Sequence, residues 1–234
     1  MKKPLLFLVT LLFFTSLVRA QDIPYNEEVY QNRLNDYRQN NYNNGNKNTL
    51  PLQAFLKQPI NQVAVTEMFN TIPTNGEFDF YLVQLLRVLF LSDGQYESEF
   101  LPKIQPISLW LTPNENTRVY WTENHITMWL SSQWLLHEKY DWTADAGLRE
   151  KVIHCLDLKI EHGFYEFLST VYFPYTLSGL LNLADFSEDE EIREKAKLAA
   201  NRLLKEVLMV TNDKGVFYPA SGRNYPGKFA TPYG

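Results

Sequence analysis

Hydrophobic residues recur at helical spacing along most of this chain, and polar or proline-rich breaks divide the pattern into segments. From residue 51 onward the spacing predicts a series of helices. The expected ranges are 51–58, 60–70, 77–92, 95–111, 123–138, 146–162, 174–185 and a last helix that begins at residue 187. A short polar helix is also expected at 22–39. The pattern therefore predicts an all-α protein.

Residues that favour helix starts and stops mark several of these limits. Thr122 is expected to cap the helix that begins at Glu123. Gly163 is expected to end the helix at 146–162. Pro174 suits the first turn of the next helix. Ser187, three residues before Glu190, forms a capping box and predicts a helix start at residue 187.

Buried and amphipathic helices alternate in the second half of the chain. The helices at 123–138 and 174–185 are apolar on nearly every side, whereas those at 146–162 and from 187 carry one apolar stripe. This alternation is typical of stacked antiparallel pairs, in which one helix faces an inner axis and the other faces solvent. We therefore expect alternating inner and outer helix pairs, arranged as an incomplete α/α toroid or a helical solenoid.

The N-terminus has the three parts of a secretory signal peptide. A positive start is followed by the apolar run Leu5–Leu17 and then by Val18-Arg19-Ala20, whose ends are small enough for signal peptidase. Residues 1–20 are the expected signal, with cleavage between Ala20 and Gln21. The mature protein is therefore expected to be secreted or periplasmic. No cysteine lies near the cleavage point and no later stretch is long and apolar enough to span a bilayer, so no membrane anchor is expected after cleavage.

Composition divides the rest into three parts. Residues 21–50 form a polar segment that ends in an asparagine-rich linker, and residues 51–211 form the predicted domain of helical hairpins. Residues 212–234 are rich in glycine, proline and aromatic residues. They are either a loop over a site or a turn-rich tail. No finishing element follows them, so the sequence is expected to be part of a longer protein.

Charge and cysteine content narrow the classes of partner. The whole chain has a net charge of −5, and loss of the three cations of the signal, Lys2, Lys3 and Arg19, leaves −8. Such a charge argues against nucleic acid as a partner. Cys155 is the only cysteine, which excludes an intramolecular disulfide. The four histidines lack the spacing of metal ligands, and neither a metal nor a cofactor is expected.

The first candidate site lies among the tryptophans, all five of which fall between residues 110 and 142. Glu123, Asn124 and His125 would occupy the first turn of a helix, where free N–H groups and the helix dipole favour negative charge. The Asn amide and the imidazole would there form a cradle for a carboxylate or an oxyanion. Trp121, Glu123 and Trp129 would contact a substrate. The alternative is a capped helix start with a core histidine.

Two further clusters carry potential acid and base groups. Tyr165 and Glu166 follow a helix stop, and either could transfer a proton. Arg223 and Tyr225 lie in the glycine-rich tail, where the guanidinium could bind a carboxylate in a fork. The alternative for the first of these clusters is a loop whose aromatic residues fill the core. The alternative for Arg223 is a solvated side chain without a role.

The segment that holds these three clusters resembles the α/α-toroid domains of secreted polysaccharide lyases and related exported bacterial proteins. The resemblance implies that Asn124 neutralises a uronate carboxylate and that His125 does so too or acts as the base. It implies that Tyr165 or Tyr225 is the base or acid and that Arg223 clamps the carboxylate. It covers less than half of the chain. The longer toroid and the following β-sheet domain that are common in that group are missing.

We accordingly expect an exported carbohydrate-active protein whose partner is a polysaccharide or an oligosaccharide. β-Elimination at a uronate is favoured over hydrolysis, which would need two facing carboxylates, such as Glu123 and Glu166. The alternative from another class is a non-catalytic helical-repeat protein that binds glycan or protein. The sequence leaves the oligomeric state open.

Overall fold

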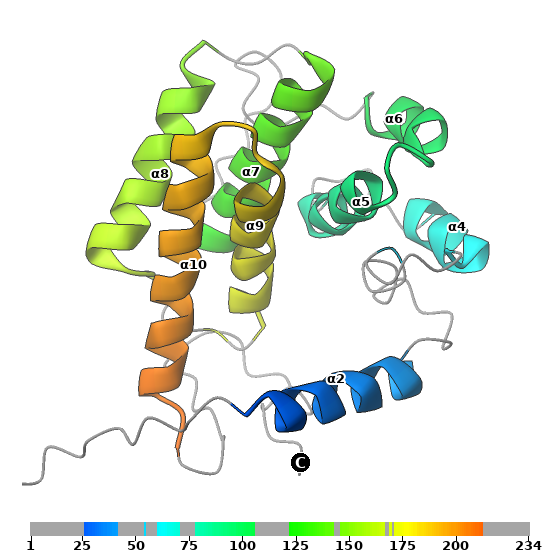
Figure 1. Ribbon diagram of the computed structural model, residues 1–234. Coiled ribbons are helices and arrows are strands. Elements are labelled where there is room, and N and C mark those ends of the chain that lie inside the picture. The colour runs from blue at the N-terminus through cyan, green and yellow to red at the C-terminus, as the bar shows by residue number, and fades with distance from the viewer. Residues whose placement is uncertain are drawn as a thin grey trace, which may run out of the picture. The chain divides into compact units, whose positions relative to one another are not determined.

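The computed structural model describes residues 26–41, 54, 60–70, 78–105, 122–142, 146–166, 169 and 171–212. These residues form α-helices and no β-strand, which confirms the prediction of an all-α protein (Figure 1). The chain divides into two units, residues 1–43 and 44–234, and each is described by itself. The helices are α2 (Glu27–Asn41), α4 (Gln62–Asn70), α5 (Asp79–Leu91), α6 (Glu97–Ile104), α7 (Glu123–Tyr140), α8 (Leu148–His162), α9 (Phe173–Phe186) and α10 (Glu190–Met209).

Helix α2 is the described part of the first unit, and it is the polar helix expected from the sequence. The side-chain oxygen of Asn26 accepts the N–H of Val29 at 3.0 Å, which satisfies one free donor of the first turn. Glu27 and Glu28 place negative charge at the positive end of the helix dipole. Both features stabilise the start of the helix.

Helix α7 is the central element of the second unit. It packs against α5, α8 and α9, while α10 packs against both α8 and α9 (Figure 1). One hydrophobic core joins α4, α5 and α6 to Trp129 and Leu136 of α7. The other joins the opposite side of α7, including Leu135, to α8, α9 and α10. Because α7 contributes to both cores, it is buried on nearly every side, as its sequence predicts.

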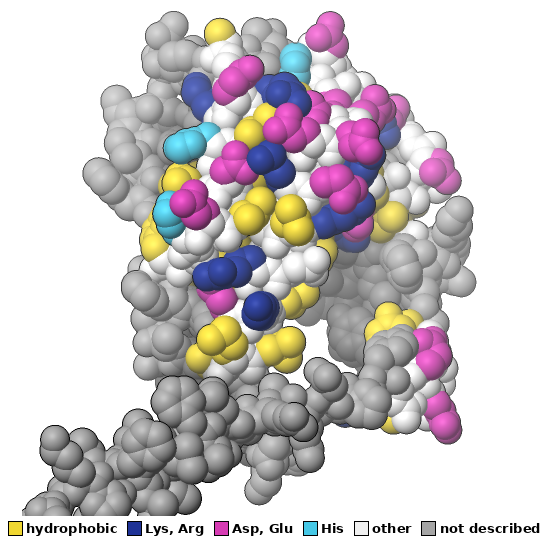
Figure 2. All heavy atoms as spheres, turned by 60° about the vertical axis from the view of Figure 1, so that its left-hand side comes forward, with side chains coloured by type: hydrophobic (Ala, Val, Ile, Leu, Met, Phe, Trp, Pro, Cys, Tyr) yellow, Lys and Arg dark blue, Asp and Glu magenta, His cyan; other side chains and the backbone are white. Residues whose placement is uncertain are grey.

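Helices α8 and α10 each bury one stripe and expose the other side. Val152 and Leu156 lie on the buried stripe of α8, and Ile192 and Ala196 on that of α10. On the solvent side, basic and acidic side chains are interspersed over the two helices (Figure 2). The amphipathic character predicted for both helices is thus confirmed.

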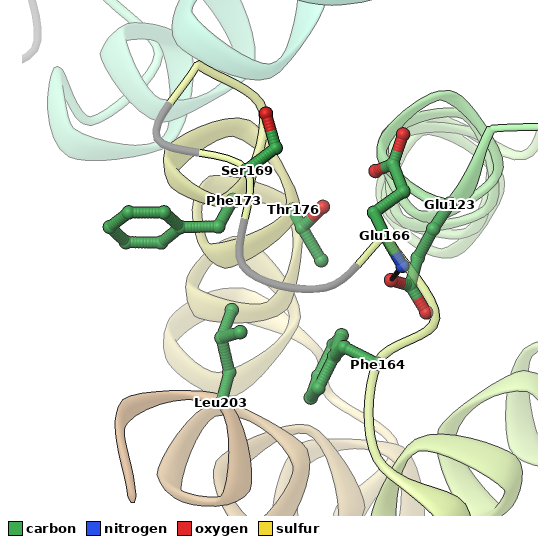
Figure 3. Close-up of a pocket in the computed structure, with 7 residues that line it drawn as sticks. All are labelled: Glu123, Phe164, Glu166, Ser169, Phe173, Thr176 and Leu203. Atoms are coloured by element: carbon green, nitrogen blue, oxygen red, sulfur yellow. Dashed lines mark hydrogen bonds between the residues drawn. The ribbon is translucent and has the colours of Figure 1, made fainter. Parts of the chain in front are cut away.

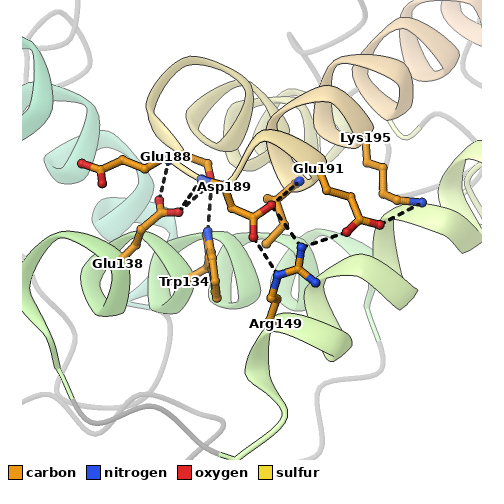
Figure 4. A network of polar contacts seen from close by, with 9 residues as sticks. Trp134, Glu138, Arg149, Glu188, Asp189, Glu191 and Lys195 are labelled. Carbon is orange, nitrogen blue, oxygen red and sulfur yellow. Dashed lines mark hydrogen bonds and ion pairs between the residues drawn. The ribbon is translucent and has the colours of Figure 1, made fainter.

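The turn between α9 and α10 is held by the C-terminal part of α7 (Figure 4). The Glu138 carboxylate accepts the N–H groups of Glu188 and Asp189, both at 2.8 Å. Trp134 donates its indole N–H to the Ser187 hydroxyl at 3.0 Å. These bonds satisfy backbone and side-chain groups that the tight turn would otherwise leave without partners.

The capping box predicted at Ser187 is wrong. Helix α10 begins at Glu190, and Asp189 is its N-cap, with a side chain that accepts the N–H of Ile192 at 3.1 Å. Ser187 ends α9 instead, and its hydroxyl binds Trp134 and Glu138 of α7. Local sequence offered two capping residues two positions apart, and the tertiary contact with α7 selected between them.

None of the helices in the described ranges is long and apolar enough to cross a membrane. Most predicted helix limits agree with the structure to within two or three residues. Thr122 is the N-cap residue of α7, although its side chain makes no capping hydrogen bond, and Gly163 ends α8. The predicted helix at 95–111 is represented by α6, which ends at Ile104, and the remainder of that range lies outside the described residues.

Helices α7 and α9 approach each other closely at Gly179. A Cβ atom at this glycine would lie 3.0 Å from the Ser131 hydroxyl and 3.2 Å from the Thr127 carbonyl oxygen. Replacing Gly179 by Val should therefore separate the helices and lower the free energy of unfolding by about 2 kcal/mol or more. Urea denaturation measures the change.

The matched control places the same β-branched residue on the exposed side of α9. Leu181, 37% exposed, is changed to Val, and a change of at most about 0.5 kcal/mol is expected. Equal losses in the two variants would show that valine itself, and not the close approach, weakens the helix.

Candidate functional site at the start of helix α7

The candidate site is built where α7 begins and where the turn after α8 passes beside it. Gly163 ends α8 with φ of +78°, a backbone conformation that favours glycine, and its N–H bonds the Lys159 carbonyl at 3.0 Å. The chain then turns through Phe164, Tyr165 and Glu166, which contact the first residues of α7. The helix stop at Gly163 thereby brings Tyr165 and Glu166, the second predicted cluster, to the first cluster at Glu123–His125.

Glu123 and Lys159 form a buried ion pair at this junction. Their side chains are only 1% and 7% exposed, and the Lys159 ammonium binds Oε1 of Glu123. The ammonium also lies 4.7 Å from the centre of the Tyr165 ring. Taking both charges out of water costs several kcal/mol each, so each is tolerable only while the other is present.

The carboxylates of Glu123 and Glu166 bind backbone N–H groups across this junction. The Glu123 carboxylate accepts the N–H groups of Tyr165 at 3.3 Å and of Glu166 at 3.1 Å. The Glu166 carboxylate in turn accepts the N–H of Asn124 at 2.9 Å, one of the donors that the first turn of α7 leaves without an intrahelical partner. A side chain of the helix start thus binds the backbone of the turn, and a side chain of the turn binds the backbone of the helix start.

The Glu166 carboxyl holds its proton more tightly than an ordinary glutamate. Burial is the main cause that raises its pKa above the usual 4.5, against the hydrogen bond from Asn124, which lowers it. The negative charge of Glu123 raises the pKa further, and the positive charges of His125 and Lys159 lower it.

His125 is oriented by a carboxylate from another helix. Its Nδ1 atom binds Asp79, the first residue of α5, whose side chain is fully buried, while the His125 side chain is 16% exposed. Burial raises the pKa of Asp79, and the contact with His125 lowers it. An edge-to-face contact with the Phe80 ring, 4.9 Å between ring centres, further fixes the imidazole. A carboxylate on Nδ1 is the arrangement that sets the tautomer and orientation of a proton-accepting histidine.

Asn124 and Tyr165 differ sharply in environment. The Asn124 side chain is 1% exposed, and its amide has no hydrogen-bond partner among the described residues. Tyr165 is 50% exposed. Burial, and then the negative charges of Glu123 and Glu166, raise the pKa of Tyr165 to about 12. Near neutral pH the phenol therefore keeps its proton and can serve as a donor.

A small pocket opens beside the two glutamates (Figure 3). Counted out to its open mouth, the space is about 190 Å³. Most of this volume is open solvent, and the enclosed part has room for about one water molecule. The lining residues are Glu123, Phe164, Glu166, Ser169, Phe173, Thr176 and Leu203.

Five of the residues predicted from the sequence meet at this end of α7. They are Glu123, Asn124, His125, Tyr165 and Glu166. Trp129 lies further along α7, 3% exposed, in the core with α4 and α5. Trp121, Arg223 and Tyr225 lie outside the described residues. The roles assigned to all nine residues stay predictions.

Sequence reasoning missed Lys159 and Asp79. Both left a signal, because each is a charged residue in an apolar pattern. Lys159 continues the stripe of Val152 and Leu156 at helical spacing, and Asp79 stands in the otherwise apolar start of α5. A charge on a buried stripe requires a partner, which is a reason to look for one elsewhere in the chain.

The buried pair predicts a strong dependence of stability on both partners. Lys159→Met should lower the free energy of unfolding by about 3–5 kcal/mol, since it leaves the Glu123 carboxylate without a counter-charge. The double variant Glu123→Gln with Lys159→Met should regain part of that loss, because a glutamine oxygen still accepts the turn's N–H groups. Chemical denaturation of the wild type, both single variants and the double variant measures this coupling. A double variant no more stable than Lys159→Met would contradict it.

The raised pKa of Glu166 predicts a stability cost as the pH rises. The folded protein binds this proton more tightly than the unfolded chain, so the group favours folding below about pH 4.5 and loses that advantage as the pH passes its raised pKa. Glu166→Gln should therefore lose less stability than the wild type between pH 4.5 and 7. Urea titrations across this range measure the difference, with the exposed Glu161→Gln as the charge-matched control. Parallel pH profiles for wild type and Glu166→Gln would refute the assignment.

Comparison with known proteins adds no relative. No family model matches the chain, and neither a curated protein nor a solved structure matches it. Among the described residues, no group of three or more His, Cys, Asp and Glu side chains is arranged to hold a metal ion.

Proposed function

We propose that this protein is an exported carbohydrate-active enzyme of the α/α-toroid kind that cleaves a uronate-containing polysaccharide by β-elimination. The observation that carries the proposal is the Asp79–His125 pair, which follows directly on Asn124, the residue whose N–H the Glu166 carboxylate accepts. It provides a base held in one orientation next to a second proton-transfer group. The helix pairs α7–α8 and α9–α10 would be consecutive inner and outer pairs of the toroid.

The reaction assigns a step to His125, Asp79 and Tyr165. The imidazole of His125 would take the proton from C5 of the uronate, and Asp79 would stabilise the imidazolium that forms. As the C4–O bond breaks and the C4–C5 double bond forms, the leaving oxygen would receive a proton from Tyr165, whose raised pKa keeps the phenol protonated. Atoms and charge then balance without a cofactor.

The uronate carboxylate needs a positive environment, because the C5 proton is acidic only when that charge is offset. The N-terminus of α7 offers the positive end of a helix dipole, although its Asn124 N–H is already bound by the Glu166 carboxylate. The buried Asn124 amide, which has no partner within the described part of the chain, would gain one in a carboxylate oxygen. Arg223, outside the described residues, would add the clamp that the resemblance implies.

Hydrolysis is the weaker proposal because of what Glu123 does. A hydrolase needs two carboxylates that face the glycosidic bond. Both oxygens of Glu123 are engaged, one by Lys159 and Tyr165 and the other by Glu166. Glu123 therefore serves the turn rather than a substrate, and only one carboxylate of the predicted pair remains for catalysis.

A panel of uronate polymers tests the reaction. The wild type should produce a rise in ultraviolet absorbance from the unsaturated product with at least one polymer. Asp79→Asn, which keeps the shape but removes the orienting charge, should lower kcat by about 10²–10⁴-fold. The exposed Glu161→Gln should leave kcat unchanged. Reducing ends without absorbance would move the assignment to hydrolysis, and polymer binding without cleavage would favour a non-catalytic glycan-binding protein.

A further inference from the structure

Helix α10 carries more apolar side chains at its C-terminal end than its packing requires. Val207 and Val210 continue the buried stripe of α10 and pack against the core shared with α7, α8 and α9. On the other sides of the same turns, Leu204, Leu208 and Met209 are 41%, 69% and 76% exposed. These three residues contribute little to the core, so the fold does not explain their apolar character.

The three exposed side chains are neighbours on the helix surface. Leu204 and Leu208 are four residues apart, so they lie on one side of the helix in successive turns, and Met209 directly follows Leu208. Lys205, which is also exposed, lies four residues before Met209 and on the same side as that residue. Single exposed leucines are common in soluble proteins, whereas neighbouring ones rimmed by polar residues indicate a contact surface. We call Leu204, Lys205, Leu208 and Met209 the α10 tip.

Basic residues accompany the α10 tip, and acidic residues lie at the opposite end of the helix. From Lys197 onward α10 has the cations Lys197, Arg202 and Lys205 and one acid, Glu206, which is paired with Arg202 at 2.7 Å. Residues 188–194 contain five acids and one arginine. Figure 2 shows most acidic side chains over the upper part of this face, and hydrophobic side chains with basic ones beside them at its lower end, where α10 ends. This end of the helix is thus suited to an anionic partner.

The net charge of −5 belongs to the whole chain and not to this end of α10. Salt screens exposed charges beyond about 8–10 Å, so the nearest residues decide what the tip attracts. Acids at a helix start and cations toward its end also suit the helix dipole. The dipole accounts for the cations, but it does not account for the exposed leucines and methionine beside them. Apolar side chains rimmed by cations are typical of a segment that binds at a lipid–water boundary.

The shape of the α10 tip favours a lipid bilayer over a protein. Leu208 and Met209 expose more than two thirds of their area, so they stand out from the surface. A protein partner would need a matching hollow, whereas the acyl region of a bilayer accepts an apolar tip of any shape. Lys205 lies four residues before Met209, which is about 6 Å along a helix. Surface-bound helices enter a bilayer by about 5–10 Å, so Lys205 would reach the lipid phosphates when Met209 is inserted.

We propose that the α10 tip is a peripheral binding surface for membranes that contain anionic phospholipid. Leu204, Leu208 and Met209 enter the boundary between headgroups and acyl chains, and Lys205 binds the phosphates, with Arg202 and Lys197 one to two turns behind it. The contact needs no membrane-spanning helix. It does not depend on the β-elimination reaction, so either proposal can fail without the other.

Sedimentation with lipid vesicles tests the proposal. The chain that begins at Gln21 is used, because the apolar run Leu5–Leu17 would itself enter lipid, and it keeps every residue that the structure describes. It should bind vesicles of phosphatidylglycerol and phosphatidylcholine at least tenfold more tightly than vesicles of phosphatidylcholine alone, and added salt should weaken that binding. Equal binding to both kinds of vesicle, or binding to neither, would overturn the proposal.

Variants locate the surface. The double variant Leu208→Asp with Met209→Asp should weaken binding to the anionic vesicles at least tenfold, and Lys205→Gln should weaken it severalfold. The matched controls are Leu181→Asp on α9 and Lys103→Gln on α6, both of which should bind like the wild type. Thermal unfolding followed by circular dichroism verifies that each variant is folded. Wild-type binding by the double variant would refute the assignment to the α10 tip.

Ultracentrifugation without lipid distinguishes a membrane surface from a contact between copies of the chain. The wild type and the Leu208→Asp, Met209→Asp double variant should have the same distribution of mass, because the tip does not bind a second copy. An oligomer that forms in the wild type and is lost in the double variant, together with no binding to anionic vesicles, would assign the α10 tip to self-association and overturn the proposal.

Discussion

The ion pair between Glu123 and Lys159 is the interaction on which this end of the molecule depends. It is buried, it joins the first residue of α7 to α8, and its carboxylate also binds two N–H groups of the turn that follows α8. Neither charge could stay in this apolar setting alone. The pair therefore fixes where the turn runs, and the turn fixes where Glu166 and Tyr165 lie.

The polar side chains at the start of α7 have different kinds of partner. The Glu123 carboxylate binds Lys159 and two backbone N–H groups, whereas His125 is oriented by Asp79 and the Glu166 carboxyl has a raised pKa. The same burial that makes the ion pair obligatory raises the pKa of Glu166.

The sequence predicted the helices well because their signals are local. The stripe of α10, the stop at Gly163 and the all-round apolar character of α7 depend on spacing and on the conformational preferences of single residues. The helix start at Ser187 was predicted wrongly, since Ser187 and Asp189 are both good caps. Contacts of Ser187 with Trp134 and Glu138 decided between them.

The composition of the first turn of α7, with Glu123, Asn124 and His125 at a helix N-terminus, was determined by sequence alone. Which of these residues is structural and which is available for chemistry was decided by tertiary structure. Lys159, on a neighbouring helix, binds Glu123. Asp79, on a helix more than forty residues earlier in the chain, binds His125. The ionisation and role of a buried group depend on the charges beside it, and residues far apart in sequence supply those charges.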